Sequence, residues 1–177
     1  MLKKIRQPIF FMIIATATVI WQWSFINSLP DFFSYFNLVL TVLVLTVFFF
    51  DFRSAAFFAL AAGFWLDIMA FNFFGLYLIV VLTVALVAER LLSSWLTNRS
   101  FYSFLALLLL STGFYNFLVF GLLNISEQDA GIFFLFRSSF WHSLGYQAIW
   151  NFIGALFLFN LANRITPRLK PFFLSDN

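Results

Sequence analysis

The sequence contains no cysteine and a single histidine, His142. The lack of cysteine excludes disulfides, thiol catalysis and thiolate metal sites, and one histidine argues against a histidine-based metal centre. Charged residues make up only 10% of the chain, whereas about 25% is usual in a soluble domain. We therefore predict no metal and no cofactor. The formal net charge of +3 bears on membrane orientation and does not indicate nucleic-acid binding.

Patterns of catalytic residues are also missing. The chain has no Ser/His/Asp arrangement, no glycine-rich phosphate loop, no HExxH motif and no pair of carboxylates within an apolar run. His142 follows Trp141, an arrangement typical of a membrane interface, and Glu127 and Asp129 lie in a separate polar segment. We expect that the protein is not an enzyme.

Apolar residues, by contrast, are abundant. They make up 63% of the chain, compared with about 45–50% in soluble domains. Long continuous runs of them indicate membrane-spanning helices, since barrel strands would alternate in segments of about 10 residues. The runs cover residues 9–25, 33–50, 54–71, 76–92, 101–123 and 144–161. We predict an all-α integral membrane protein, a single domain over residues 1–177 with a bundle of about six transmembrane helices.

The charges between the runs predict the orientation of the chain. Nine of the ten Lys and Arg lie at the two ends of the chain and in residues 51–53 and 89–100, and only Arg137 lies on the opposite side. The positive-inside rule then places both termini in the cytoplasm. Residues 132–142 are apolar but too short to span. They are an interfacial segment, a re-entrant segment or an early start of the last helix.

Small residues form a stripe along the third run. Ala55, Ala59 and Gly63 recur every four residues, and Asp67 continues the series. Small side chains at this spacing allow another helix to approach closely. We interpret these residues, with Gly75 after the turn, as a helix-contact or partner surface.

Asp67 is also the one carboxylate placed within an apolar run. A charge there costs about 2.5–3.5 kcal/mol on insertion scales, so it is a candidate functional residue. Its partner could be an arginine, Asn116, Asn151 or another chain. Gln147 and Asn151 form a polar seam at helical spacing, and with Asn37 and Asn116 they are the candidate polar interior.

Residues 37–76 carry a pattern that resembles the bacterial rod shape-determining protein MreD family. That family has an Asn near the start of the second helix, a basic residue at the next turn, a Gly-x-x-x-Asp ending the third helix, and a Gly eight residues later. The corresponding residues here are Asn37, Arg53, Gly63, Asp67 and Gly75. Asn116 matches a polar residue midway along the fifth helix. The chain departs from the pattern at Phe36, where proline is frequent, and at Ala59, where glycine is frequent.

The resemblance implies a non-enzymatic component of the cell-shape and elongation machinery that assists assembly of the peptidoglycan-synthesis complex. It also implies a lipid bilayer, an MreC-like membrane protein and cell-wall synthesis proteins as partners, with a location in the bacterial cytoplasmic (inner) membrane. The architecture of this family is similar to that of the S components of energy-coupling-factor transporters.

Two alternatives remain open. The first is a substrate-binding S component of an energy-coupling-factor vitamin transporter, for which the seam of Gln147 and Asn151 could line a pocket. Such subunits usually carry a small-xxx-small pattern in the first helix, whereas here Ala15 is followed four residues later by Val19. The second is a membrane assembly factor of no known class.

Overall fold

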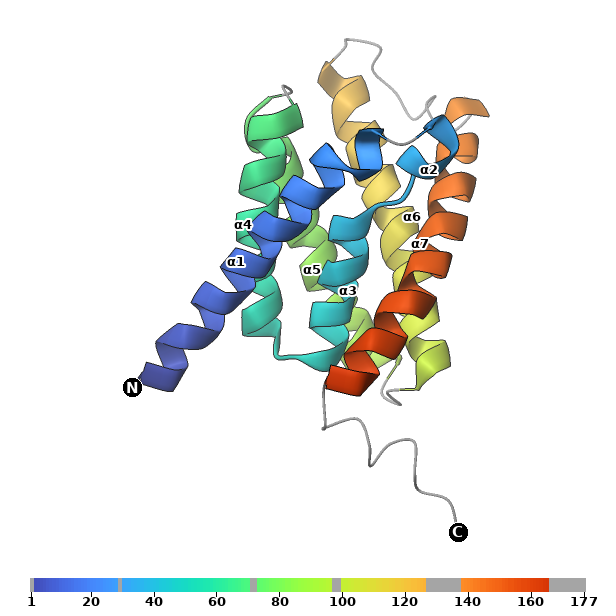
Figure 1. The fold of residues 1–177 in the computed structure, drawn as a ribbon. Coiled ribbons are helices and arrows are strands. Elements are labelled where there is room, and N and C mark those ends of the chain that lie inside the picture. The colour runs from blue at the N-terminus through green and yellow to red at the C-terminus, as the bar shows by residue number, and fades with distance from the viewer. Residues whose placement is uncertain (1, 29, 71–72, 97–99, 127–137, 166–177) are drawn as a thin grey trace.

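The computed structural model describes residues 2–28, 30–70, 73–96, 100–126 and 138–165, and every regular element among them is helical (Figure 1). Within this part of the chain, five helical segments are long and apolar enough to cross a membrane, and α3 is a shorter apolar helix. The elements are α1 (Leu2–Ser24), the 3₁₀ turn η1 (Ile26–Ser28), α2 (Asp31–Ser34), α3 (Leu38–Phe49), α4 (Phe52–Ala70), α5 (Leu76–Ser94), α6 (Phe101–Ser126) and α7 (Ser138–Ile165). The chain is a multi-pass helical membrane protein, as its composition predicted.

The central helix of the bundle is α3. It contacts α1, α4, α5, α6 and α7 (Figure 1), and nine of its twelve residues are buried. Its sequence is apolar on every side, which is typical of a helix that other helices surround.

The outer faces of the surrounding helices are apolar too. Ile13 of α1, Ile79 of α5 and Phe157 of α7 expose 62%, 58% and 72% of their surfaces. A soluble protein would not leave such contiguous apolar faces in water. These faces contact the lipid bilayer.

The expected continuous helix over residues 33–50 is wrong, because α2 ends at Ser34 and α3 begins only at Leu38. Hydropathy could not detect this break, since the residues at it are mostly aromatic. α7 begins at Ser138, so residues 138–142 are an early start of the last helix. Residues 132–137 lie outside the described part.

Three helices are longer than predicted. α1 already begins at Leu2, α6 continues to Ser126 into the expected polar loop, and α7 continues to Ile165 into the expected tail. The remainder of that loop and tail lies outside the described residues. α1 begins and α7 ends at the same end of the bundle, whereas α2 and the start of α7 lie at the opposite end (Figure 1).

Candidate functional site

Asp67 caps the helix that follows its own. The side chain is buried, with 4% exposed. Its Oδ1 accepts a hydrogen bond from the backbone N–H of Tyr77 at 2.8 Å, and its Oδ2 accepts one from Leu78 at 3.1 Å. Both N–H groups belong to the first turn of α5, where donors lack partners within the helix and the dipole favours negative charge. Backbone donors therefore occupy Asp67, in place of the arginine or asparagine partners that we considered.

Two glycines make this cap possible. Gly75 precedes α5 with a φ of 102°, a left-handed conformation that favours glycine, and its carbonyl accepts from Ile79 at 3.0 Å. Gly63 lies one turn before Asp67 and packs against the α5 backbone, because a Cβ there would lie 2.5 Å from the Cα of Leu78. Gly63 thus sets the close approach of α4 to α5, and this approach brings Asp67 to the N–H groups.

The small-residue stripe is internal to this chain. Ala55, Ala59 and Gly63 are all buried, and α4 packs extensively against α5 and α1. The predicted contact surface therefore lies between the chain's own helices. Gly75, after the turn, is half-buried.

The break between α2 and α3 is held by polar side chains from distant helices. The N–H of Asn37 donates to Oδ1 of Asn151 at 2.9 Å, and the N–H of Leu38 donates to Oε1 of Gln22 at 2.7 Å. The Nε2 of Gln22 in turn donates to the carbonyl of Phe36 at 2.9 Å. Non-helical backbone at membrane depth needs such partners within the protein, since lipid supplies none.

Asn37 contributes its side chain as well. Its Oδ1 caps α3 by accepting from the N–H of Leu40 at 2.9 Å, and the same side chain is hydrogen-bonded to Tyr115 of α6. Asn37 therefore joins the start of the central helix to α6 and α7.

A second set of amides continues this network between α6 and α7. Asn151 donates through Nδ2 to the hydroxyl of Thr112 at 3.1 Å. Asn116 donates to the Thr112 carbonyl at 2.9 Å and to Oε1 of Gln147. Asn116, Gln147 and Asn151 expose 4%, 8% and 0% of their surfaces. We name Gln22, Asn37, Thr112, Asn116, Gln147 and Asn151 the polar centre.

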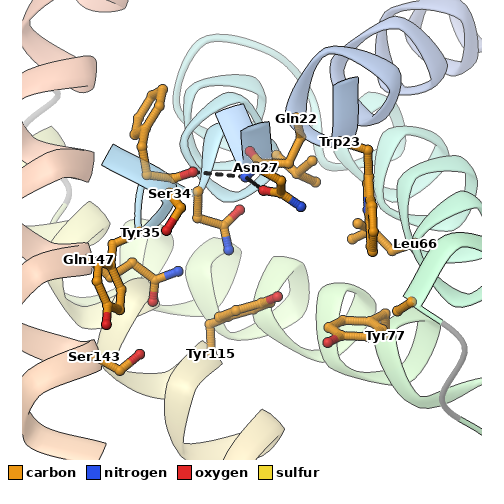
Figure 2. A pocket seen from close by; sticks show the side chains of 14 residues that line it. Gln22, Trp23, Asn27, Ser34, Tyr35, Leu66, Tyr77, Tyr115, Ser143 and Gln147 are labelled. Carbon is orange, nitrogen blue, oxygen red and sulfur yellow. Dashed lines mark hydrogen bonds between the residues drawn. The ribbon is translucent and has the colours of Figure 1, made fainter. Parts of the chain in front are cut away.

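A cavity of about 260 Å³ adjoins the polar centre at the α2 end of the bundle. Figure 2 shows Gln22, Asn27 and Trp23 along one side of it and Tyr115 and Tyr77 across from them, with the two tyrosine hydroxyls pointing toward one another. Among the described residues that line it, none is charged.

All four residues of the predicted polar interior, Asn37, Asn116, Gln147 and Asn151, belong to one hydrogen-bond network. Asp67 is not part of it, because it caps α5. Sequence reasoning missed Gln22, Thr112 and Tyr115. Gln22 lies between two tryptophans at the end of the first run, so we interpreted its surroundings only as an interfacial belt. A polar residue in an otherwise apolar run was the signal that could have found it.

Among the residues that the structure describes, the other ionisable groups form no further site. His142 is exposed and stacks on Tyr146, with ring centroids 6.4 Å apart. Within the described ranges, no three His, Asp or Glu side chains gather where they could hold a metal ion.

Comparisons of this chain with protein families, with curated proteins and with solved structures found no match. The class of protein defined by the fold is a multi-pass all-α membrane bundle, with a capped α4–α5 pair and a buried polar centre beside a cavity.

Proposed function

We propose that this chain is a non-enzymatic membrane component of the bacterial cell-elongation machinery, resembling MreD, which assists assembly of the peptidoglycan-synthesis complex. The main support for the proposal is that residues matching the MreD pattern have specific structural roles in this chain. Asn37 caps α3, Gly63 admits α5, Asp67 caps α5, and Gly75 adopts the left-handed turn. Because four of the five matching residues have a specific structural role, the resemblance is better explained by a family signature than by a chance likeness between apolar chains.

The proposed role is that of a membrane-embedded scaffold. Because the small-residue stripe is internal, a partner helix would contact the outward face of α4. That face carries Leu60, Phe64 and Ile68, four residues apart and 39–43% exposed. A row of large apolar side chains at this spacing suits a transmembrane helix of an MreC-like protein, whose approach depends on how α5 holds α4.

We further propose that the protein lies in the bacterial cytoplasmic membrane with both termini in the cytoplasm. The charge count between the apolar runs supports this orientation. The polar centre and the cavity would then lie toward the outer leaflet.

Partner capture tests the proposal. The tagged chain is extracted from native membranes in mild detergent, and the proteins that accompany it are identified. We expect an MreC-like protein and cell-wall synthases. Recovery of neither, from membranes that contain both, would contradict the proposal.

A pair of glycine variants makes this test specific to the α4–α5 pair. Gly63→Ala places a Cβ against the α5 backbone, whereas Gly113→Ala meets nothing within 4 Å. At equal amounts of chain in the membrane, we expect Gly63→Ala to reduce partner recovery several-fold and Gly113→Ala to leave it unchanged. Equal recovery with both would show that the α4–α5 packing has no part in the assembly.

The cavity favours a second candidate, the S component of an energy-coupling-factor vitamin transporter, since such a subunit needs a small-molecule site. Ala15 and Val19 of α1 are both fully buried, so the position where that family usually shows a small residue packs inside the bundle. In the capture experiment, recovery of a pair of ATPases with a transmembrane coupling subunit would favour this candidate over the scaffold.

A further inference from the structure

The cavity at the α2 end has the dimensions of a site for one small ring compound. Its volume of about 260 Å³ is just below the roughly 300–1,000 Å³ of pockets for drug-sized ligands. It is bounded by the loop after α1, by the break before α3 and by the starts of α5 and α7. The lining residues come from the break before α3 and from each of the helices α1 to α7, so the cavity is built by the whole bundle.

The charge of the lining excludes ions. No described residue of the lining is charged, and Asp67, near the end of α4, already accepts two backbone N–H groups. A carboxylate, a phosphate or an ammonium group placed here would lose its water without meeting an opposite charge, which is costly. The ligand is therefore neutral.

Polar groups in the lining remain available to a ligand. Gln147 is 8% exposed, and its Oε1 accepts from Asn116 while its Nε2 has no partner among the described residues. Figure 2 shows this amide inside the cavity, near Ser143 and Tyr115. The Ser143 hydroxyl likewise has no described partner. The cavity thus offers an amide donor and a hydroxyl close together, a pair that suits a ring carbonyl beside a ring N–H.

The walls around these groups are aromatic. Trp23, Tyr35, Tyr77 and Tyr115 come from four different segments of the chain and present rings or hydroxyls to the same space (Figure 2). Aromatic walls favour a flat ring, which gains from stacked or edge contacts. A sugar would instead need a polar partner for each of its hydroxyls, and most of the amides here are already bonded to the protein.

We propose that this cavity is a binding site for a small, flat, uncharged heterocyclic compound with an amide-like edge. The proposal does not depend on the proposed function, because an assembly scaffold or a transport subunit could each carry such a site. Binding is measured on the purified chain alone, so its failure would leave the partner-capture result untouched, and the reverse also holds.

The test is titration calorimetry on the full chain in detergent, with probes matched in ring and different in charge. The neutral probes are nicotinamide and uracil, and their charged counterparts are nicotinate and orotate, with glucose as a neutral sugar. We expect saturable binding of at least one neutral ring and at least tenfold weaker binding of its charged counterpart. Saturable binding of glucose alone, equal binding of the charged counterparts, or no saturable heat from any probe would overturn the proposal.

Variants on α7 test whether the ligand binds in this cavity. Ser143→Phe fills the space and should abolish binding of the neutral ring, whereas Ser138→Phe, at an exposed position on a different face of the same helix, should leave it unchanged. Ser143→Ala, which adds no bulk and preserves the fold, should weaken binding about three- to tenfold, in line with the loss of one hydrogen bond. Unchanged binding in both Ser143 variants would refute this location.

Discussion

At the scale of single residues, the described acids and amides inside the bundle are largely occupied with backbone groups. Asp67 satisfies two N–H groups of α5, Gln22 satisfies an N–H and a carbonyl at the break, and Asn151 satisfies the N–H of Asn37. In lipid these backbone groups have no water to bond to. A polar side chain that hydrogen-bonds to them therefore stabilises the fold by more than the cost of burying that side chain.

Replacement of Asp67 tests this view. Asp67→Ala leaves the N–H groups of Tyr77 and Leu78 buried and unpaired, and we expect it to lower the free energy of unfolding by about 2 kcal/mol. Asp67→Asn keeps one acceptor oxygen and should cost about half as much. The measurement is denaturation of the purified protein in mixed micelles. An alanine variant as stable as the original protein would show that the cap contributes nothing.

The sequence singled out Asp67 but not its partners. Its place within an apolar run and its spacing from Gly63 marked it as unusual. Backbone N–H groups, however, are the same at every residue, so no pattern of side chains could show that the first turn of α5 is what Asp67 binds. The small-residue stripe has the same limitation. Its spacing predicts that a helix packs closely against it, but it does not show whether that helix belongs to this chain or to another.

At the scale of helices, the broken segment formed by α2 and α3 is the distinctive feature. Its non-helical connection is stabilised from α1 by Gln22 and from α7 by Asn151, so its conformation depends on helices that are far apart in the chain. Hydropathy predicted one span here because the connection is only three residues long and mostly aromatic, so it does not interrupt the apolar run. The existence of the other five long helices was predictable, and their ends were predicted less well.

Two asparagine variants on α7 can distinguish the loss of the hydrogen bond at the break from the general effect of replacing an asparagine by leucine. Asn151→Leu removes the acceptor of the Asn37 N–H, and we expect a loss of about 1–3 kcal/mol in stability. Asn160→Leu, at an exposed position of the same helix, should change stability little. The check is the thermal midpoint of both variants in one detergent, and equal midpoints would contradict the importance of this hydrogen bond.

At the scale of the whole molecule, the start of α1 and the end of α7 lie at the same end of the bundle, as an even number of predicted apolar runs implies (Figure 1). The five long apolar helices could be predicted, because the free energy of membrane insertion depends mainly on the length and composition of each apolar run. The residues of the polar interior could be predicted from the sequence. The cavity could not, because it is formed by the break and by aromatic side chains, and aromatic residues are too frequent throughout this sequence to mark one place.

The lack of cysteine makes the orientation directly measurable. Ser28, at the α2 end, and Ser94, at the end of α5, are both exposed. With Ser28→Cys we expect labelling of intact spheroplasts by a membrane-impermeant maleimide, and with Ser94→Cys we expect labelling only after the membrane is opened. The opposite pattern would invert the proposed topology.

The hydrogen bonds of the Asp67 cap and the hydrogen bond between Asn37 and Asn151 differ in how far along the chain they reach, and this difference bears on biosynthesis. Asp67 meets its N–H groups 10 and 11 residues later, so α4 and α5 can close as a hairpin as soon as both have left the ribosome. Asn37 meets Asn151 across 114 residues, so the start of α3 keeps an unsatisfied N–H until the last helix is made. We therefore expect release of the finished chain from the insertion machinery to depend on the arrival of α7, and a chain truncated before α7 to be recognised and degraded as incomplete.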